Sequence, residues 1–225
     1  MPFNPVVLLT SRDRLPLEPV PTTHMRIIAG AIREAWARML VDCRETATQA
    51  IEAEVNGALV THMQDALRER SPFSSLVHSV LRGIEQYNYD GTHFEKRPDL
   101  NILFRRRDGS FPLAAECKII DHGNGQSVHK YDINGIARFQ NGDYGWFHRQ
   151  GFMVAYVRDA TLAEAAIHRV TGAAPARWPT QRGEHFHTTH ARTFRYVGRE
   201  PGEDAPGDID LIHVWLTDAS GTDQT

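Results

Sequence analysis

The sequence has few of the features that would set the chain apart from ordinary globular proteins. It contains only two cysteines, Cys43 and Cys117, which imply no disulfide and fit a reducing, cytoplasmic setting. No apolar run approaches the ~18 residues of a membrane span, and the proline-containing start does not resemble a secretory signal. Strong charge is also missing: the formal net charge is −3, so any nucleic-acid binding needs locally basic surface.

Helical periodicity dominates the first third of the 225 residues. Thr22-Thr23 can cap a helix that begins near residue 24. Apolar residues at spacings of three and four predict a second helix over about 46–69, which a Ser-Pro pair at residue 71 ends. A third, short helix is expected over about 73–84.

Strand patterns follow in the middle and at the end of the chain. Two apolar runs flank Asp108-Gly109, which is typical of a β-hairpin, and the continuous apolar run 151–157 is typical of a buried strand. The other expected elements are helices over 128–140 and 161–170 and strands over 187–197 and 209–216. A buried strand reached through a helical crossover predicts an α/β fold, with a central mixed sheet flanked by helices.

The hairpin carries the most informative polar residues. Successive strand residues point to opposite faces, so Glu116 and Lys118 share one face and Cys117, a small core residue, lies on the other. If the hairpin folds about its turn, Asp99 lies across from residues 116–118. Ionisable groups on an apolar hairpin are costly unless they are paired or bind metal, so this patch is the candidate site.

Converging carboxylates make an oxygen-only site that suits Mg²⁺ or Mn²⁺. Asp99 and Glu116 are the expected side-chain ligands, and the backbone carbonyl near Cys117 can supply a third oxygen. Lys118 can orient or help deprotonate an attacking water and can offset charge on a phosphate. The set therefore predicts hydrolytic phosphoryl transfer.

These residues resemble the signature of a known family. Pro98-Asp99 followed by Glu116-x-Lys118 on the next strand is similar to the motif of the PD-(D/E)XK nuclease superfamily, over about residues 46–157. The resemblance implies a restriction-endonuclease-like core, a helical N-terminal part and extra C-terminal strands. It also implies Mg²⁺-dependent cleavage of DNA that leaves a 5′-phosphate.

The family's core helix usually adds another acidic residue, and the sequence offers Glu52 and Glu54. The apolar stripe that includes Ile51 and Val55 places Glu52 nearer the sheet at ~100° per residue. Glu52 is therefore expected to assist in metal coordination or water positioning. The alternative is that both are solvated surface acids.

Basic residues near this site are candidate phosphate contacts. They are Arg105, Arg106 and Arg107 at the hairpin tip, and Lys130 and Arg138 on the following helix. That helix and the Gly-Asp-Tyr after it resemble a Y…G…RF…G.Y pattern of some defence-type members of the superfamily. Alternatively, the tip is only a solvated turn and Arg138 pairs with Asp132 or Asp143.

A second stretch, residues 176–199, combines arginines with aromatic residues, as nucleic-acid grooves often do, but the aromatics could equally be core. It includes His185, His187 and His190, whose spacing allows metal binding, phosphate contacts or plain packing.

The expected organisation is one nuclease domain over residues 23–217, with a C-terminal extension from about 172, between an N-terminal arm (1–22) and a tail (218–225). The expected function is a metal-dependent endodeoxyribonuclease of phage defence or restriction. Double-stranded DNA is the expected partner, with a homo-oligomer or a defence-system protein as a further one and no membrane. The alternatives are a catalytically silent nuclease-like module and an RNA-cleaving nuclease.

Overall fold

The computed structural model describes residues 15–86, 88–89, 96–105, 111–125, 128–158, 176–180, 183–196 and 205–218. Three predictions lie outside these residues: the turn at Asp108-Gly109, the helix over 161–170, and most of the arm and the tail. The side chains of residues 122, 176–180 and 183–186 are likewise outside the description.

A seven-stranded mixed sheet forms the centre of the described chain, in the order β1-β2-β3-β4-β7-β6-β5. Its strands are β1 (Val77–Arg82), β2 (Leu100–Phe104), β3 (Leu113–Ile120), β4 (Gln150–Val157), β5 (Ala176–Thr180), β6 (Gly183–His190) and β7 (Ile209–Thr217). β3, β4 and β7 run parallel, whereas the outer pairs are antiparallel. The three parallel strands are buried along nearly their whole length, because helices cover both of their faces.

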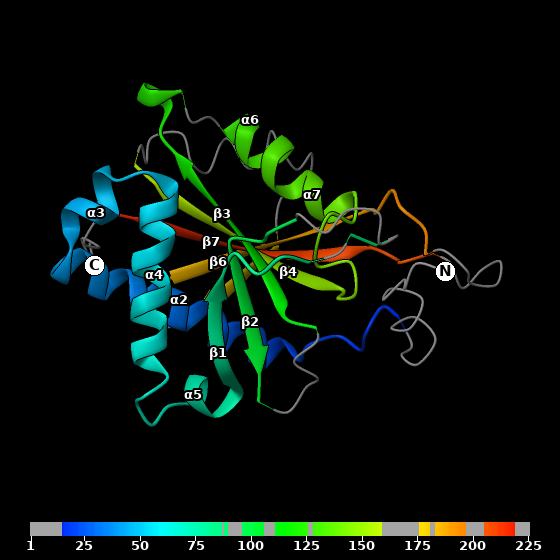
Figure 1. Cartoon of the computed structure of the whole chain (residues 1–225), viewed down its shortest axis with the longest axis horizontal. Helices are drawn as coiled ribbons and strands as arrows, with labels where there is room; N and C mark the ends of the chain where they lie inside the picture. The colour runs from blue at the N-terminus through cyan, green and yellow to red at the C-terminus, as the bar shows by residue number, and fades with distance from the viewer. Residues whose placement is uncertain are drawn as a thin grey trace.

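Two helical layers enclose the sheet, as Figure 1 shows. One contains α2 (Thr22–Asp42), α3 (Arg44–Gln49), α4 (Glu52–Ala66) and α5 (Pro72–Leu76). The other is the crossover from β3 to β4, which contains the 3₁₀ turn η1 (His122–Asn124), α6 (Val128–Tyr131), the π-helical turn η2 (Asp132–Ile136) and α7 (Ala137–Gln140). The predicted α/β class, with helices on both sides of a mixed sheet, is confirmed.

A separate hydrophobic core joins each helical layer to its face of the sheet. On the first face, buried residues of α2 and α4 such as Met39 and Leu59 pack with Cys117 and Tyr156. On the second face, α6 and α7 pack on alternate residues of the same strands. None of the helices in the described part of the chain is both long and apolar enough to span a bilayer.

The predicted helix over 46–69 is wrong in its continuity. The chain breaks helical geometry at Ala50 and Ile51, whose ψ angles are 164° and 156°, so α3 ends and α4 begins at Glu52. The Ala50 carbonyl accepts a hydrogen bond from Arg158 at the end of β4, a contact that helical periodicity cannot reveal. Ile51, expected on the apolar face, is 66% exposed.

Two further local predictions need correction. Thr22 and Thr23 do not cap the first helix: Pro21 occupies the N-cap position without a side-chain hydrogen bond. The short helix expected over 73–84 ends at Leu76, and β1 follows because it pairs with β2, a long-range partner. The Ser-Pro pair begins this short helix rather than ending the previous one, since Ser71 forms a capping box with Ser74.

The strand expected over 187–197 also differs. β6 begins earlier, at Gly183, and ends at His190. Residues 191–196 leave the sheet because Phe194 and Tyr196 are buried in an aromatic cluster with Trp146 and Phe147. These two aromatic residues are therefore core, the second of the two interpretations that the sequence allowed.

Candidate active site

The candidate site lies where β2 and β3 part. Their pairing runs from Ile102↔Leu113 to Leu100↔Ala115, after which β3 continues alone on this side and remains paired with β4 on the other. The predicted hairpin pairing of these two strands is confirmed. The Cys117 backbone faces the resulting gap: its N–H donates to Asp99 Oδ2 at 2.8 Å, and its carbonyl accepts from Lys118 Nζ at 2.7 Å.

Three predicted carboxylates meet around the ammonium group of the fourth predicted residue, Lys118. Lys118 Nζ lies 2.8 Å from Glu116 Oε1, 3.0 Å from Glu52 Oε1 and 3.7 Å from Asp99 Oδ2. With the Cys117 carbonyl, these oxygens surround the ammonium on several sides. Glu116 and Lys118 are protected from solvent, with exposed fractions of 1% and 13%, whereas Asp99 and Glu52 are 23% and 35% exposed.

Glu52 reaches this cluster because α4 begins with it. An acidic residue in the first turn of a helix is favoured by the helix dipole and by unpaired N–H groups there. From this position Glu52 also accepts a hydrogen bond from the Ile119 backbone at 3.3 Å. Glu54, the alternative acid, is exposed.

Charge and burial set the protonation of the central pair. Burial, together with the negative charge of Asp99, raises the pKa of Glu116 to about 7. Burial alone would lower the pKa of Lys118, but the charges of Glu116, Asp99 and Glu52 outweigh it and raise that pKa above its ordinary value. As held here, Lys118 is therefore a protonated donor, and water deprotonation by its amine is not favoured.

The second wall of the site comes from the crossover helix. Arg138 Nη1 lies 3.3 Å from Glu116 Oε1, and its side chain is 41% exposed. Gly135, in η2, packs against the sheet: an added Cβ would lie 2.5 Å from Met153 Cε and 3.8 Å from Glu116 Cγ. This close approach, which only a glycine permits, brings the turn onto Glu116.

The donor chemistry fits a hard divalent cation, although the described residues form no preassembled metal site. Among the described residues, no group of three or more His, Cys, Asp and Glu side chains is arranged to hold a metal by itself. However, the cluster offers only oxygen atoms, and Glu116 Oε2 is buried without a described hydrogen-bond partner. A cation there would have to displace the Lys118 ammonium from some of these oxygens.

The other predicted residues within the described part of the chain lie away from this cluster. Arg105 follows the end of β2 that is remote from Asp99. The two residues are six positions apart, so at a strand rise of ~3.3 Å per residue they are separated by about 20 Å. Its Nε donates to the Ser74 carbonyl, and Arg106 and Arg107 lie outside the described residues. Arg105 therefore lies at the end of β2 opposite the site, and the phosphate contacts expected of Arg106 and Arg107 stay predictions.

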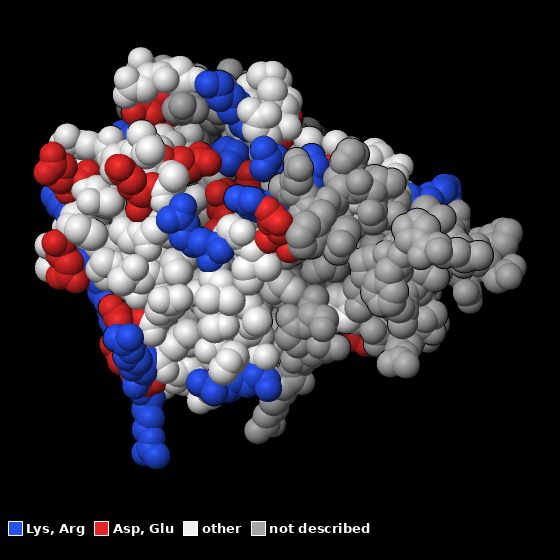
Figure 2. Space-filling model, in the orientation of Figure 1, with Lys and Arg blue, Asp and Glu red and all other residues white. Residues whose placement is uncertain are grey.

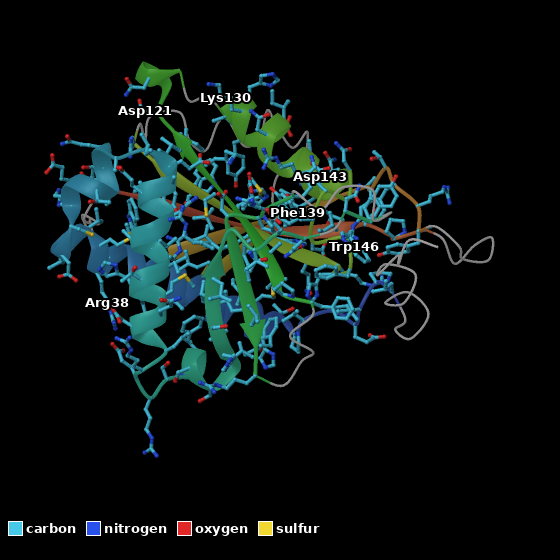
Figure 3. All side chains as sticks on the ribbon, in the orientation of Figure 1. Arg38, Asp121, Lys130, Phe139, Asp143 and Trp146 are labelled. Atoms are coloured by element: carbon cyan, nitrogen blue, oxygen red, sulfur yellow. The ribbon has the colours of Figure 1, made fainter. Side chains whose placement is uncertain are left out.

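Lys130 and the histidines are also separate from the cluster. Lys130 projects from the exposed side of α6 (Figure 3). His187 lies 3.1 Å from Asp210, and His190 is hydrogen-bonded to Thr188, while the His185 side chain lies outside the described part. On the face shown in Figure 2, acidic and basic side chains are interspersed across the upper left, an uncharged area lies beneath them, and further charged side chains lie along the lower left edge and the bottom.

Sequence reasoning missed two neighbours of the site, Asn56 and Tyr156, and included a third, Tyr144, only as part of a sequence pattern. Asn56 is hydrogen-bonded to Asp99, Tyr156 is hydrogen-bonded to Asn56, and the buried Tyr144 hydroxyl lies near Glu116 without a regular hydrogen bond among the described residues. One signal was available: Asn56 is four residues after Glu52, on the same helical face.

Comparison of the chain with protein-family models, with curated proteins and with solved structures finds no match.

Proposed function

We propose that the chain is a metal-dependent nuclease that hydrolyses phosphodiester bonds in DNA. The observation that carries this proposal is the meeting of Glu52, Asp99, Glu116 and Lys118 with the Cys117 carbonyl at one gap in the sheet. Burying Glu116 and Lys118 beside two further carboxylates costs folding free energy, and clusters of this kind are enriched at functional sites.

Asp99, Glu116 and the Cys117 carbonyl would hold Mg²⁺ or Mn²⁺. When bound, a divalent cation supplies a Lewis acid that polarises the phosphate and offsets its charge. Lys118, once released from the carboxylates, adds a second positive charge beside the phosphate. Glu52, at the opening of α4, is placed to receive the Lys118 ammonium or to orient water.

The fold supports a restriction-endonuclease-like core. Helix α4, the hairpin strands β2 and β3, the crossover helices and β4 lie within residues 46–157, over which the sequence resembles the superfamily. Arg138, half-exposed beside Glu116, is the residue best placed to contact a phosphate on the substrate. Restriction or phage defence is the setting that this resemblance suggests, with double-stranded DNA as the substrate and a second copy or a partner protein supplying specificity.

Plasmid nicking tests the proposal. We expect cleavage with Mg²⁺ or Mn²⁺ that EDTA abolishes, and a loss of about 100-fold or more for Asp99→Asn and Lys118→Met. Glu52→Gln and Glu54→Gln form a matched pair on α4, and only the first should lower the rate. A parallel series with RNA measures whether the same site prefers that substrate.

The proposal fails if purified wild-type protein leaves DNA and RNA intact with every divalent metal tested. A gel shift of the uncleaved DNA by that same protein would then favour the binding module over the enzyme. Cleavage that survives Asp99→Asn and Lys118→Met unchanged would instead indicate a contaminating nuclease.

A further inference from the structure

Both oxygens of the Asp99 carboxylate are held by neutral donors. Oδ2 accepts the Cys117 N–H at 2.8 Å, and Oδ1 accepts the side-chain amide of Asn56 at 2.9 Å. The two donors come from different elements, β3 and α4, on two sides of the carboxylate. The rotation of Asp99 is therefore fixed from both of its oxygens.

Asn56 is itself fixed by Tyr156 of β4. The Tyr156 hydroxyl donates to Asn56 Oδ1 at 2.7 Å, and both side chains are buried, with exposed fractions of 0% and 1%. Burial raises the pKa of Tyr156, so its hydroxyl keeps its proton and donates. The amide oxygen of Asn56 must then face Tyr156, which leaves its –NH₂ group facing Asp99.

The tyrosine ring has its own support, independent of the hydrogen bond. It stacks on Trp36 of α2, with ring centroids 5.5 Å apart. Tyr156, Asn56 and Asp99 thus form a chain of hydrogen bonds from the hydrophobic core to the candidate site. Tyr156 lies on β4, Asn56 on α4 and Asp99 directly before β2, so three different elements position the three residues.

We propose that Asn56 is a positioning residue for Asp99, which it holds in the orientation needed to bind a divalent cation. This inference rests on the proposed function, because it assigns Asp99 as a metal ligand. A neutral amide suits this role, because it orients the carboxylate without cancelling the charge that attracts the cation. Partners of this kind behind metal ligands typically contribute about 10–100-fold to metal affinity.

Mn²⁺ titration of the full chain without nucleic acid, by calorimetry, tests the inference. Asn56→Ala should raise the Kd for Mn²⁺ by about 10-fold or more while circular dichroism shows a folded protein. Asn101→Ala is the matched control, because Asn101 is equally buried, lies close by on β2 and is hydrogen-bonded to Gln86 rather than to Asp99. It should lower the melting temperature and leave the Kd unchanged.

Tyr156→Phe keeps the test decisive if Asn56→Ala does not fold. It removes one oxygen atom, retains the stacking on Trp36 and frees the Asn56 amide to turn, so it should raise the Kd for Mn²⁺ above that of wild type. The inference is overturned if Asp99→Asn abolishes the binding of Mn²⁺ seen with wild type, but the Asn56 and Tyr156 variants bind Mn²⁺ with the Kd of wild type. Wild type that binds no Mn²⁺ overturns the proposed function instead.

Discussion

Replacement of Lys118 by methionine tests the electrostatics of the site whether or not the chain is an enzyme. Methionine keeps much of the length and volume of the side chain and removes its charge. Glu116, 1% exposed, is then left with Arg138 at 3.3 Å as its nearest described cation. The substitution therefore separates the charge of Lys118 from its packing.

The expected loss in the free energy of unfolding of Lys118→Met follows from the burial of Glu116. Removing one partner of a buried ion pair destabilises a protein by ~3–5 kcal/mol, and Arg138 should bring this variant toward ~3 kcal/mol. The raised pKa of Glu116 also fixes the sign of the pH dependence. A carboxyl group whose pKa is raised in the folded state binds more protons when folded, so the free energy of unfolding falls as the pH rises from about 4.5, its ordinary pKa, through about 7. Loss of Lys118 raises this pKa further, and the cost should grow between about pH 6 and pH 8.

Urea unfolding in EDTA, followed by tryptophan fluorescence, measures this free energy. Lys96→Met is the control, because Lys96 pairs with Asp143 at 3.1 Å with 40% of its side chain exposed, and a surface pair contributes ~1 kcal/mol or less. Adding Glu116→Gln to Lys118→Met should restore stability, because both buried charges are then gone. The reasoning is refuted if Lys118→Met costs no more than Lys96→Met, or if the double variant is less stable than the single.

Three other outcomes are expected. Burial lowers the pKa of His213 to about 3, so below pH ~6.5 the unfolded chain binds more protons than the folded chain. The free energy of unfolding of wild type should therefore fall by ~1.4 kcal/mol per pH unit there, relative to that of His213→Asn. Urea unfolding at a series of acidic pH values measures this difference. Gly142→Ala should lower the free energy of unfolding by ~1–3 kcal/mol, because a φ of +73° is strained for alanine and a Cβ would lie 2.7 Å from a Phe194 ring atom. Gly30→Ala is the control: Gly30 lies in α2 with open space around it, so this change should raise the free energy of unfolding by up to ~1 kcal/mol. Lys130→Ala should reduce the slope of log affinity for DNA against log salt by ~0.9 if Lys130 contacts a phosphate, and an unchanged slope in fluorescence anisotropy would place it outside the interface.

The sequence by itself determined the elements whose signals are local. The apolar run of β4 and the hairpin of β2 and β3 were predicted because strand alternation and turn chemistry depend on neighbouring residues. The same alternation placed Glu116 and Lys118 on one face of a strand. Their proximity to Asp99 followed from the hairpin alone.

Tertiary structure decided the rest, because the deciding contacts join residues far apart in the chain. Arg158 donates to the Ala50 carbonyl at the break between α3 and α4, and this break places Glu52 at the start of α4. Residues 77–82 form a strand by pairing with β2. Asn56 meets Asp99 and Tyr156 across separations of 43 and 100 residues. Local propensity carries no information about such partners: the hairpin specifies its own acids and lysine, but only the assembled sheet and helices determine what orients them.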